Sequence, residues 1–176
     1  RDRAGNDAGD LSGQSVTNST SDTTAPTAAI TTPSDGALVS SQNTISGTAS
    51  DNVGVSGVSL QIQRSGDSSY WTGSGWQSGQ TSVQASGTAS WSYDASGITG
   101  DDTYTVTAIA TDGAGNTGSS SSVSYTIDAT APTLISATVD GKTLTLTYDE
   151  TLDSGSVPAA GDFTVTVNGS TVTVSA

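Results

Sequence analysis

The residues best suited to chemistry are oxygen-bearing side chains in a glycine-rich turn that runs from Asp112 to Asn116. An alternating run, Tyr104–Ala110, comes before this turn and a second run, Val123–Ile127, follows it, so the turn joins two predicted strands. A carboxylate and a carboxamide four residues apart on a tight turn can point at one place. Such oxygen ligands suit Ca²⁺, which makes the turn a candidate calcium loop.

The composition leaves little for enzyme chemistry. The chain has no His and no Cys, which removes the commonest general base, the thiolate nucleophile and the usual zinc ligands. Paired carboxylates occur at Asp101-Asp102 and Asp149-Glu150, but neighbouring residues on a strand point to opposite faces. We therefore predict no catalytic residues and no enzymatic activity.

The excess of acidic residues disfavours negatively charged partners. Lys and Arg total 4 against 17 acidic residues, which gives a net charge of -13. Nucleic acid and anionic membrane surfaces would be repelled, and no apolar run is long enough for a membrane span. All the acidic residues except Glu150 are Asp, the carboxylate typical of turns and of calcium loops. We expect a monomer without membrane insertion.

The elements that must position these side chains are short strands separated by turns. About seven strands with turns every 8 to 12 residues predict an all-β, immunoglobulin-like antiparallel sandwich without a convincing helix. Tyr104, at the start of the sixth strand, has the position of a tyrosine corner. The expected strands are Thr27–Thr31, Asn43–Ser50, a run from Val58 to near Arg64, a strand with Trp91 and Tyr93, Tyr104–Ala110 and Val123–Ile127.

Two internal echoes indicate a modular array. Asp2–Asn6 resembles Asp112–Asn116, and Thr24-Ala25-Pro26-Thr27 recurs as Thr130-Ala131-Pro132-Thr133. We interpret residues 1–23 as the tail of a preceding module and a linker, 24–128 as one whole module, and 129–176 as an incomplete second module. A half-sandwich of this kind would leave one sheet face uncovered.

Several segments resemble known families. The segments Asp22–Thr27, Ile45–Val55 and Tyr104–Asn116 resemble a bacterial Ig-like domain of the type repeated in large surface adhesins and secreted proteins. Residues 130–176, with Thr143–Glu150 and Phe163–Gly169, are similar to the first half of a repeat named after a cyanobacterial swimming-motility surface protein. The resemblance implies a tandem array with neighbouring modules of the same chain as partners, outside a bacterial cell.

The expected sandwich brings several oxygen-bearing residues to one end. The start of the first strand, the second-to-third loop and the sixth-to-seventh loop meet there, and they carry the candidate ligands Asp22, Asp51, Asn52, Asp112 and Asn116. Carboxylates that converge without a basic residue repel one another, and Ca²⁺ would remove that cost. The alternative is that these residues only cap turns. A second candidate cluster, at the junction with the next module, comprises Asp128, Asp149, Glu150 and Asp153.

The aromatic residues allow two interpretations. Tyr70, Trp71 and Trp76 could form a platform that stacks on sugars, or they could complete a small core. We expect Trp91 and at least one of Trp71 and Trp76 to be core. The function predicted is a non-catalytic, calcium-stiffened spacer in a long bacterial surface or secreted protein, whose other domains could contact a glycan or another surface. The alternatives are a carbohydrate- or surface-binding module that uses the Trp71/Trp76 loop, and an accessory domain of a secreted enzyme that acts on glycosides.

Overall fold

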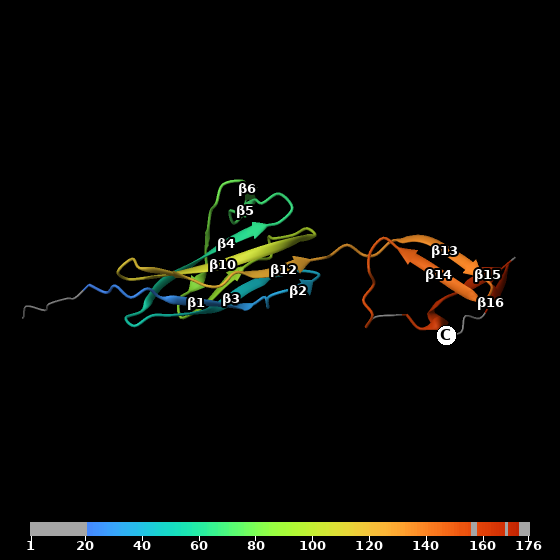
Figure 1. Ribbon diagram of the computed structural model, residues 1–176, viewed down its shortest axis with the longest axis horizontal. Coiled ribbons are helices and arrows are strands. Elements are labelled where there is room, and N and C mark those ends of the chain that lie inside the picture. Colours follow the sequence, from blue (N-terminus) through green and yellow to red (C-terminus); the bar gives the residue numbers. More distant parts are fainter. Residues whose placement is uncertain (1–20, 156–157, 168, 173–176) are drawn as a thin grey trace, which may run out of the picture. The chain divides into compact units, whose positions relative to one another are not determined.

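The computed structural model describes residues 21–155, 158–167 and 169–172. Residues 2–6, and most of the predicted linker 1–23, lie outside this described part. The chain divides into two compact units between Ala129 and Thr130, shown in Figure 1. Each unit is described by itself below.

The first sheet of unit 1 has four strands in the order β1-β3-β9-β8, and each pair is antiparallel. Its strands are β1 (Thr27–Thr32), β3 (Thr44–Ser50), β8 (Ser86–Gly87) and β9 (Ser90–Asp94). Side chains alternate along β3, where Ile45 and Ala49 are buried and Thr44, Thr48 and Ser50 are exposed. This is the pattern of a strand with one face on a core and the other in water.

The second sheet of unit 1 has the order β2-β12-β10-β4-β5-β6, with β11 also pairing with β10 and β7 with β4. Its strands are β2 (Ala37–Val39), β4 (Val55–Arg64), β5 (Tyr70–Trp71), β6 (Trp76–Gln77), β7 (Val83–Gln84), β10 (Asp102–Asp112), β11 (Thr117–Ser119) and β12 (Val123–Ile127). Every pair is antiparallel except β2 with β12, which run parallel. The predicted all-β, Ig-like sandwich is confirmed.

The core lies between the inner faces of the two sheets. Val58, Leu60 and Ile62 of β4 are fully buried, and burial of each stabilises the fold by about 1.5–3 kcal/mol. Trp91 of β9 is 3% exposed, which confirms the expectation that it is a core residue. Small residues make room for it, since a Cβ added at Gly47 would lie 2.3 Å from the Trp91 ring and 2.0 Å from the Ala29 carbonyl oxygen.

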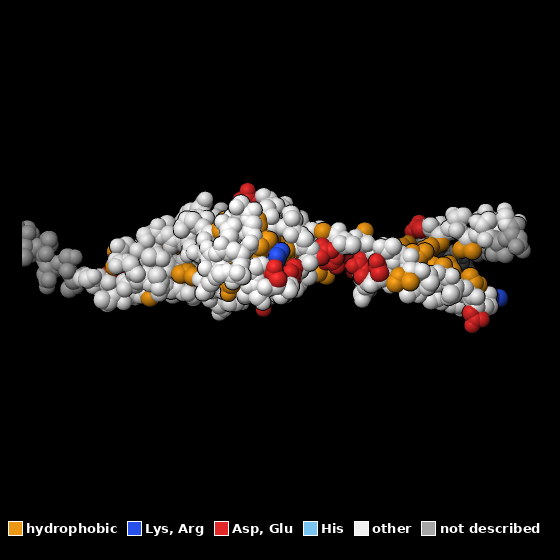
Figure 2. Space-filling model, turned by 90° about the horizontal axis from the view of Figure 1, so that it is seen from above, with side chains coloured by type: hydrophobic (Ala, Val, Ile, Leu, Met, Phe, Trp, Pro, Cys, Tyr) orange, Lys and Arg blue, Asp and Glu red, His pale blue; other side chains and the backbone are white. Residues whose placement is uncertain are grey.

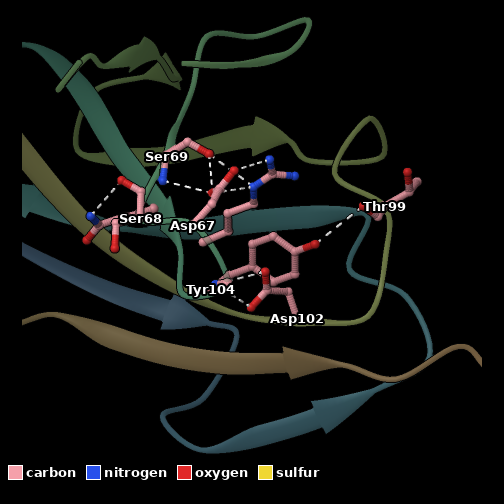
Figure 3. Close-up of polar contacts among 9 residues, drawn as sticks. Asp67, Ser68, Ser69, Thr99, Asp102 and Tyr104 are labelled. Carbon is pink, nitrogen blue, oxygen red and sulfur yellow. Dashed lines mark hydrogen bonds and ion pairs between the residues drawn. The ribbon is translucent and has the colours of Figure 1, made fainter. Parts of the chain in front are cut away.

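Tyr104 forms the predicted tyrosine corner. Its hydroxyl donates hydrogen bonds to the carbonyl oxygens of Gly100 at 2.7 Å and Thr99 at 3.3 Å, and Figure 3 shows the ring beside the loop that precedes β10. The ring stacks on Tyr125 with centroids 5.4 Å apart. These contacts fix the start of β10, and therefore the register of the long strand that ends at Asp112.

Hydroxyl side chains cover the outer face where β10 meets β12. Thr103 pairs with Thr126, Thr105 with Ser124, and Thr107 with Ser122, at 2.9 to 3.2 Å between the oxygens. Cross-strand hydroxyl pairs of this kind add stability without burying apolar surface. On the face of unit 1 seen in Figure 2, uncharged polar and backbone atoms predominate, with a few acidic side chains and one basic group among them.

The described residues of unit 2 form two hairpins. One pairs β13 (Leu134–Asp140) with β14 (Thr143–Tyr148), and the other pairs β15 (Val165–Val167) with β16 (Ser170–Val172). A 3-10 turn, η1, covers Ala160–Asp162. Leu134, Ile135 and Val139 are 49 to 66% exposed, and Figure 2 shows apolar side chains open to solvent in this unit. The β13–β14 hairpin therefore leaves apolar surface uncovered.

Candidate metal centre

The turn between β10 and β11 holds Asp112 in a fixed position. Asp112 Oδ1 accepts hydrogen bonds from the backbone N–H groups of Ala114 and Asn116, both at 2.8 Å, and Oδ2 accepts one from Asn116 Nδ2 at 2.7 Å. Gly115 has a φ of 93°, which an L residue rarely adopts and which closes the turn. The side chain of Asp112 is 3% exposed. Hydrogen bonding by Asn116 lowers the pKa of the Asp112 carboxyl, so the group is ionised at neutral pH.

Asp51 begins the loop between β3 and β4. Its Oδ2 accepts hydrogen bonds from the backbone N–H groups of Val53 and Gly54, both at 2.9 Å. This arrangement is an Asx turn, which explains why Asp is suited to the position. Its other oxygen, Oδ1, is buried and has no hydrogen-bond partner among the described residues.

Asp22 lies in the segment that leads into β1. Its Oδ1 accepts hydrogen bonds from the Thr24 N–H at 3.0 Å and from Asn52 Nδ2 at 3.4 Å. Its main-chain oxygen accepts a hydrogen bond from Asn116 Nδ2 at 3.1 Å. As with Asp51, one carboxylate oxygen, Oδ2, is buried without a partner in the described part of the chain.

The three carboxylates meet at one place. Asp22, Asp51 and Asp112 each offer an oxygen, and these atoms lie within 4.8 Å of one another. At such a distance each pair of charges repels by about 1–4 kcal/mol at effective dielectric constants between those of water and a protein surface. Arg64 is the single basic residue in the described part of unit 1, and its guanidinium is bound to Asp67, so no basic side chain among these described residues neutralises the cluster.

The geometry of the cluster fits a calcium ion. Ca²⁺ binds six to eight oxygens at about 2.3–2.6 Å, so that ligand atoms on opposite sides of the ion are about 5 Å apart. The spacing of these carboxylates falls within that span. The two oxygens without partners are the atoms that such an ion would take first, because a buried carboxylate oxygen without a partner is costly.

The two predicted amide ligands are used differently from the carboxylates. Asn116 directs its side-chain nitrogen at Asp112 and at the Asp22 carbonyl, so it joins the turn to the segment before β1. Asn52 is exposed and directs its nitrogen at Asp22. In this arrangement the amides hold the carboxylates in place.

The second predicted cluster is divided between the two units. Asp128 belongs to unit 1 and is exposed, whereas Asp149, Glu150 and Asp153 belong to unit 2. Asp149 accepts a hydrogen bond from the Thr133 N–H at 2.7 Å, which lowers its pKa. Among the residues that the structure describes, Asp22, Asp51 and Asp112 make the one group of convergent carboxylates. Metal binding by the second cluster stays a prediction.

The aromatic residues of the predicted sugar platform pack into unit 1. Trp71 is 5% exposed and donates a hydrogen bond from Nε1 to the Tyr93 hydroxyl at 2.8 Å. Its ring is tilted by 57° from that of Trp76, so the two rings do not share a plane. Tyr70 and Trp76 are half-buried, and Trp76 stacks on Tyr104 with centroids 5.7 Å apart. Sugar binding by this loop therefore has no flat, exposed pair of rings to support it.

Arg64 was not singled out by sequence reasoning. Its guanidinium donates from Nε to Asp67 Oδ1 at 2.8 Å and from Nη2 to Asp67 Oδ2, and lies 4.8 Å above the centre of the Trp76 ring. Ser69 donates to the same carboxylate. Figure 3 shows Asp67 and Ser69 side by side, with dashed lines for the contacts of the Asp67 carboxylate. The guanidinium lowers the pKa of the Asp67 carboxyl, and the two opposite charges form an ion pair. The sequence signal was a lone Arg three residues before an Asp at a strand end.

The sandwich and its Asx-turn loops define the class of protein as an Ig-like β module. Residues 26–108 match the family described as "Bacterial Ig domain", and residues 127–176 match the one described as "Putative flagellar system-associated repeat". The chain is thus similar to a bacterial Ig domain over residues 26–108 and to a flagellar system-associated repeat over residues 127–176, in agreement with the resemblances that its sequence motifs indicated. Domains of both kinds are typically non-catalytic. No curated protein matches the chain.

The described part of the chain offers no membrane-crossing helix, since none of its helical segments has the necessary length and apolar character.

Proposed function

We propose that this chain is a non-catalytic, calcium-stiffened spacer of a long bacterial surface adhesin or secreted multidomain protein. The observation that carries the proposal is the pair of buried carboxylate oxygens, Asp22 Oδ2 and Asp51 Oδ1, which lack partners in the described chain and converge with Asp112. A divalent cation held by oxygen ligands satisfies both atoms and offsets the repulsion.

The three ligands belong to different parts of the chain, and this gives the ion a mechanical role. Asp51 and Asp112 belong to loops of the sandwich, whereas Asp22 precedes β1. An ion bound by all three ties the incoming segment to the body of the domain. Repeated along an array of modules, such joints make a rod when calcium is abundant, as it is outside cells, and a looser chain when calcium is removed.

Calcium titration tests this function. With calcium at about 100 times its dissociation constant, binding to the native state alone adds about 2.7 kcal/mol to the free energy of unfolding. For a domain of this size that raises the melting temperature by roughly 10–20 °C. Calorimetric titration and thermal melts of the full chain, with calcium or with a chelator, measure the two effects.

The matched variants are Asp51→Asn and Asp94→Asn. In Asp51→Asn the side-chain amide oxygen can still accept from Val53 and Gly54, so the turn is retained while the ligand charge is lost. Asp94 accepts a local hydrogen bond from Ser96, lies outside the cluster, and controls for the change in net charge. We expect Asp51→Asn to lose most of the calcium effect and Asp94→Asn to keep it. A wild type whose stability is the same with calcium and with chelator contradicts the proposal.

A further inference from the structure

The segment that leads into β1, residues 22–26, lies against β11, and we call it the entry segment. Pro26 at its end is buried. A Cβ added at Gly118 of β11 would lie 1.7 Å from the Pro26 carbonyl oxygen and 2.9 Å from the carbonyl carbon. A glycine in a strand often marks a place where another backbone approaches closely. Only glycine at position 118 therefore allows the entry segment to lie where it does.

The strand that carries Gly118 is fixed more firmly than the segment that lies against it. β11 is paired with β10, with Gly118 opposite Ala110 and Thr117 opposite Thr111. The entry segment, by contrast, joins the first sheet only at Thr27, where β1 begins to pair with β3. A side chain at position 118 would consequently displace the entry segment, which would swing away about Thr27.

The far end of the entry segment is held by Asn116. The Asn116 Nδ2 donates to the main-chain oxygen of Asp22 at 3.1 Å and to Asp112 Oδ2 at 2.7 Å. Asn52 also donates to Asp22, but at the longer distance of 3.4 Å. Asn116 therefore holds one end of the entry segment and Gly118 accommodates the other, and we call these two residues the entry dock.

The entry dock holds the segment by its main chain and leaves a carboxylate oxygen for an ion. Asn116 and Gly118 contact the carbonyl groups of Asp22 and Pro26. Asp22 Oδ2 remains buried without a partner in the described chain, and Asp22 converges with the carboxylates of Asp51 and Asp112. An ion that met an undocked segment would have to order it first, which costs conformational entropy.

We propose that Asn116 and Gly118 dock the entry segment onto unit 1 before any ion binds, and that this docking sets the affinity for calcium by placing Asp22. Gly118 is thus a positioning residue that does not touch the ion. The statement about affinity rests on the proposed function, whereas the statement about docking does not. The apparent dissociation constant rises as the binding-competent fraction falls, so a variant docked in about one chain in ten binds calcium about tenfold more weakly.

The experiment follows the entry segment with a spin label on the full chain. Thr23 is exposed and the chain has no cysteine, so Thr23→Cys supplies one labelling position in every sample. Gly118→Ala places a methyl group against Pro26, and Asn116→Ala removes the bond to the Asp22 carbonyl without adding a clash, so it tests the dock even if Gly118→Ala does not fold. Gly75→Ala is the matched control, because a Cβ there meets nothing within 4 Å.

Electron paramagnetic resonance in the presence of chelator measures docking, and calorimetric titration with calcium measures affinity. We expect the label to be immobilised in the labelled parent and in Gly75→Ala, and mobile in Gly118→Ala and Asn116→Ala. The calcium dissociation constant of Gly118→Ala should rise about tenfold or more, while that of Gly75→Ala stays within about twofold of the parent.

Three results would overturn the proposal. The first is a label as immobile in Gly118→Ala and Asn116→Ala as in the parent. The second is a parent whose label is mobile with chelator and ordered only by calcium, because the ion would then do the docking. The third is a Gly118→Ala chain with a mobile label and unchanged calcium affinity. A parent that binds no calcium, but whose label is ordered and is released by Gly118→Ala, contradicts the calcium function and supports the dock.

Discussion

At the scale of single residues, the sandwich depends on Gly47, because the backbone of β1 and the Trp91 ring both lie close to it. Gly47 lies against the backbone of β1 on one side and the Trp91 ring on the other. A methyl group there meets a carbonyl oxygen at 2.0 Å, and backbone cannot give way as the end of a side chain can. The alternation of β3 predicts that residue 47 faces inward, but only the packing shows why it must be glycine.

We expect Gly47→Ala to lower the free energy of unfolding by more than about 3 kcal/mol, at or above the usual cost of overpacking a core. Gly57→Ala is the matched control, because a Cβ at that position of β4 meets only the side-chain nitrogen of Gln84, at 3.2 Å. Urea unfolding followed by fluorescence measures both. Similar stabilities for the two variants would show that β1 moves to accommodate the methyl group.

The two turns that carry ligands of the candidate site were predictable from the sequence. Asp51 and Asp112 precede small and glycine residues in patterns that fold locally, so their loops could be named in advance. Which oxygens remain without partners depends on how Asp22, 94 residues from Asn116, docks onto that turn. Asn116 donates to Asp112 within its own turn and to the Asp22 carbonyl across the chain, and only the first of these contacts is contained in the local sequence.

At the scale of elements, long strands were predictable and short ones were not. β12 has the predicted bounds, and β10 extends two residues beyond its prediction at each end. β2 and the hairpin β5–β6 were missed, because two or three residues cannot show an alternation. β2 exists because it pairs with β12, far along the chain, and β5 exists because Tyr70 pairs with Gln63 and Trp71 is buried.

The hairpin β5–β6 leads to a prediction about Trp71. We expect Trp71→Ala to destabilise unit 1 by about 3–5 kcal/mol, the usual cost of removing a buried aromatic side chain. Trp71→Phe keeps an aromatic ring but loses the bond to Tyr93 and part of the buried indole volume, so we expect its cost to be smaller than that of Trp71→Ala. Chemical unfolding measures both losses, and polysaccharide titration of the same variants provides the check. A Trp71→Ala chain as stable as the wild type but deficient in glycan binding would establish a sugar site instead.

At the scale of the whole molecule, every residue of the buried core, from Ile45 to Ile127, belongs to unit 1. We therefore expect a fragment of residues 21–129 to fold alone, with a melting temperature within a few degrees of the value for unit 1 in the full chain. Circular dichroism measures the two melts. An unfolded fragment, or a large drop in its melting temperature, would mean that unit 1 depends on the remainder of the chain.

The ion pair of Arg64 also affects how readily a protease that recognises basic residues can cleave unit 1. An enzyme that cleaves after Lys or Arg finds one such residue, Arg64, between Arg3 and Lys142. That residue ends β4, and its side chain is held by Asp67 and covers Trp76. A protease of this kind must therefore free the Arg64 side chain from Asp67 and Trp76 before it can cleave the domain at this point.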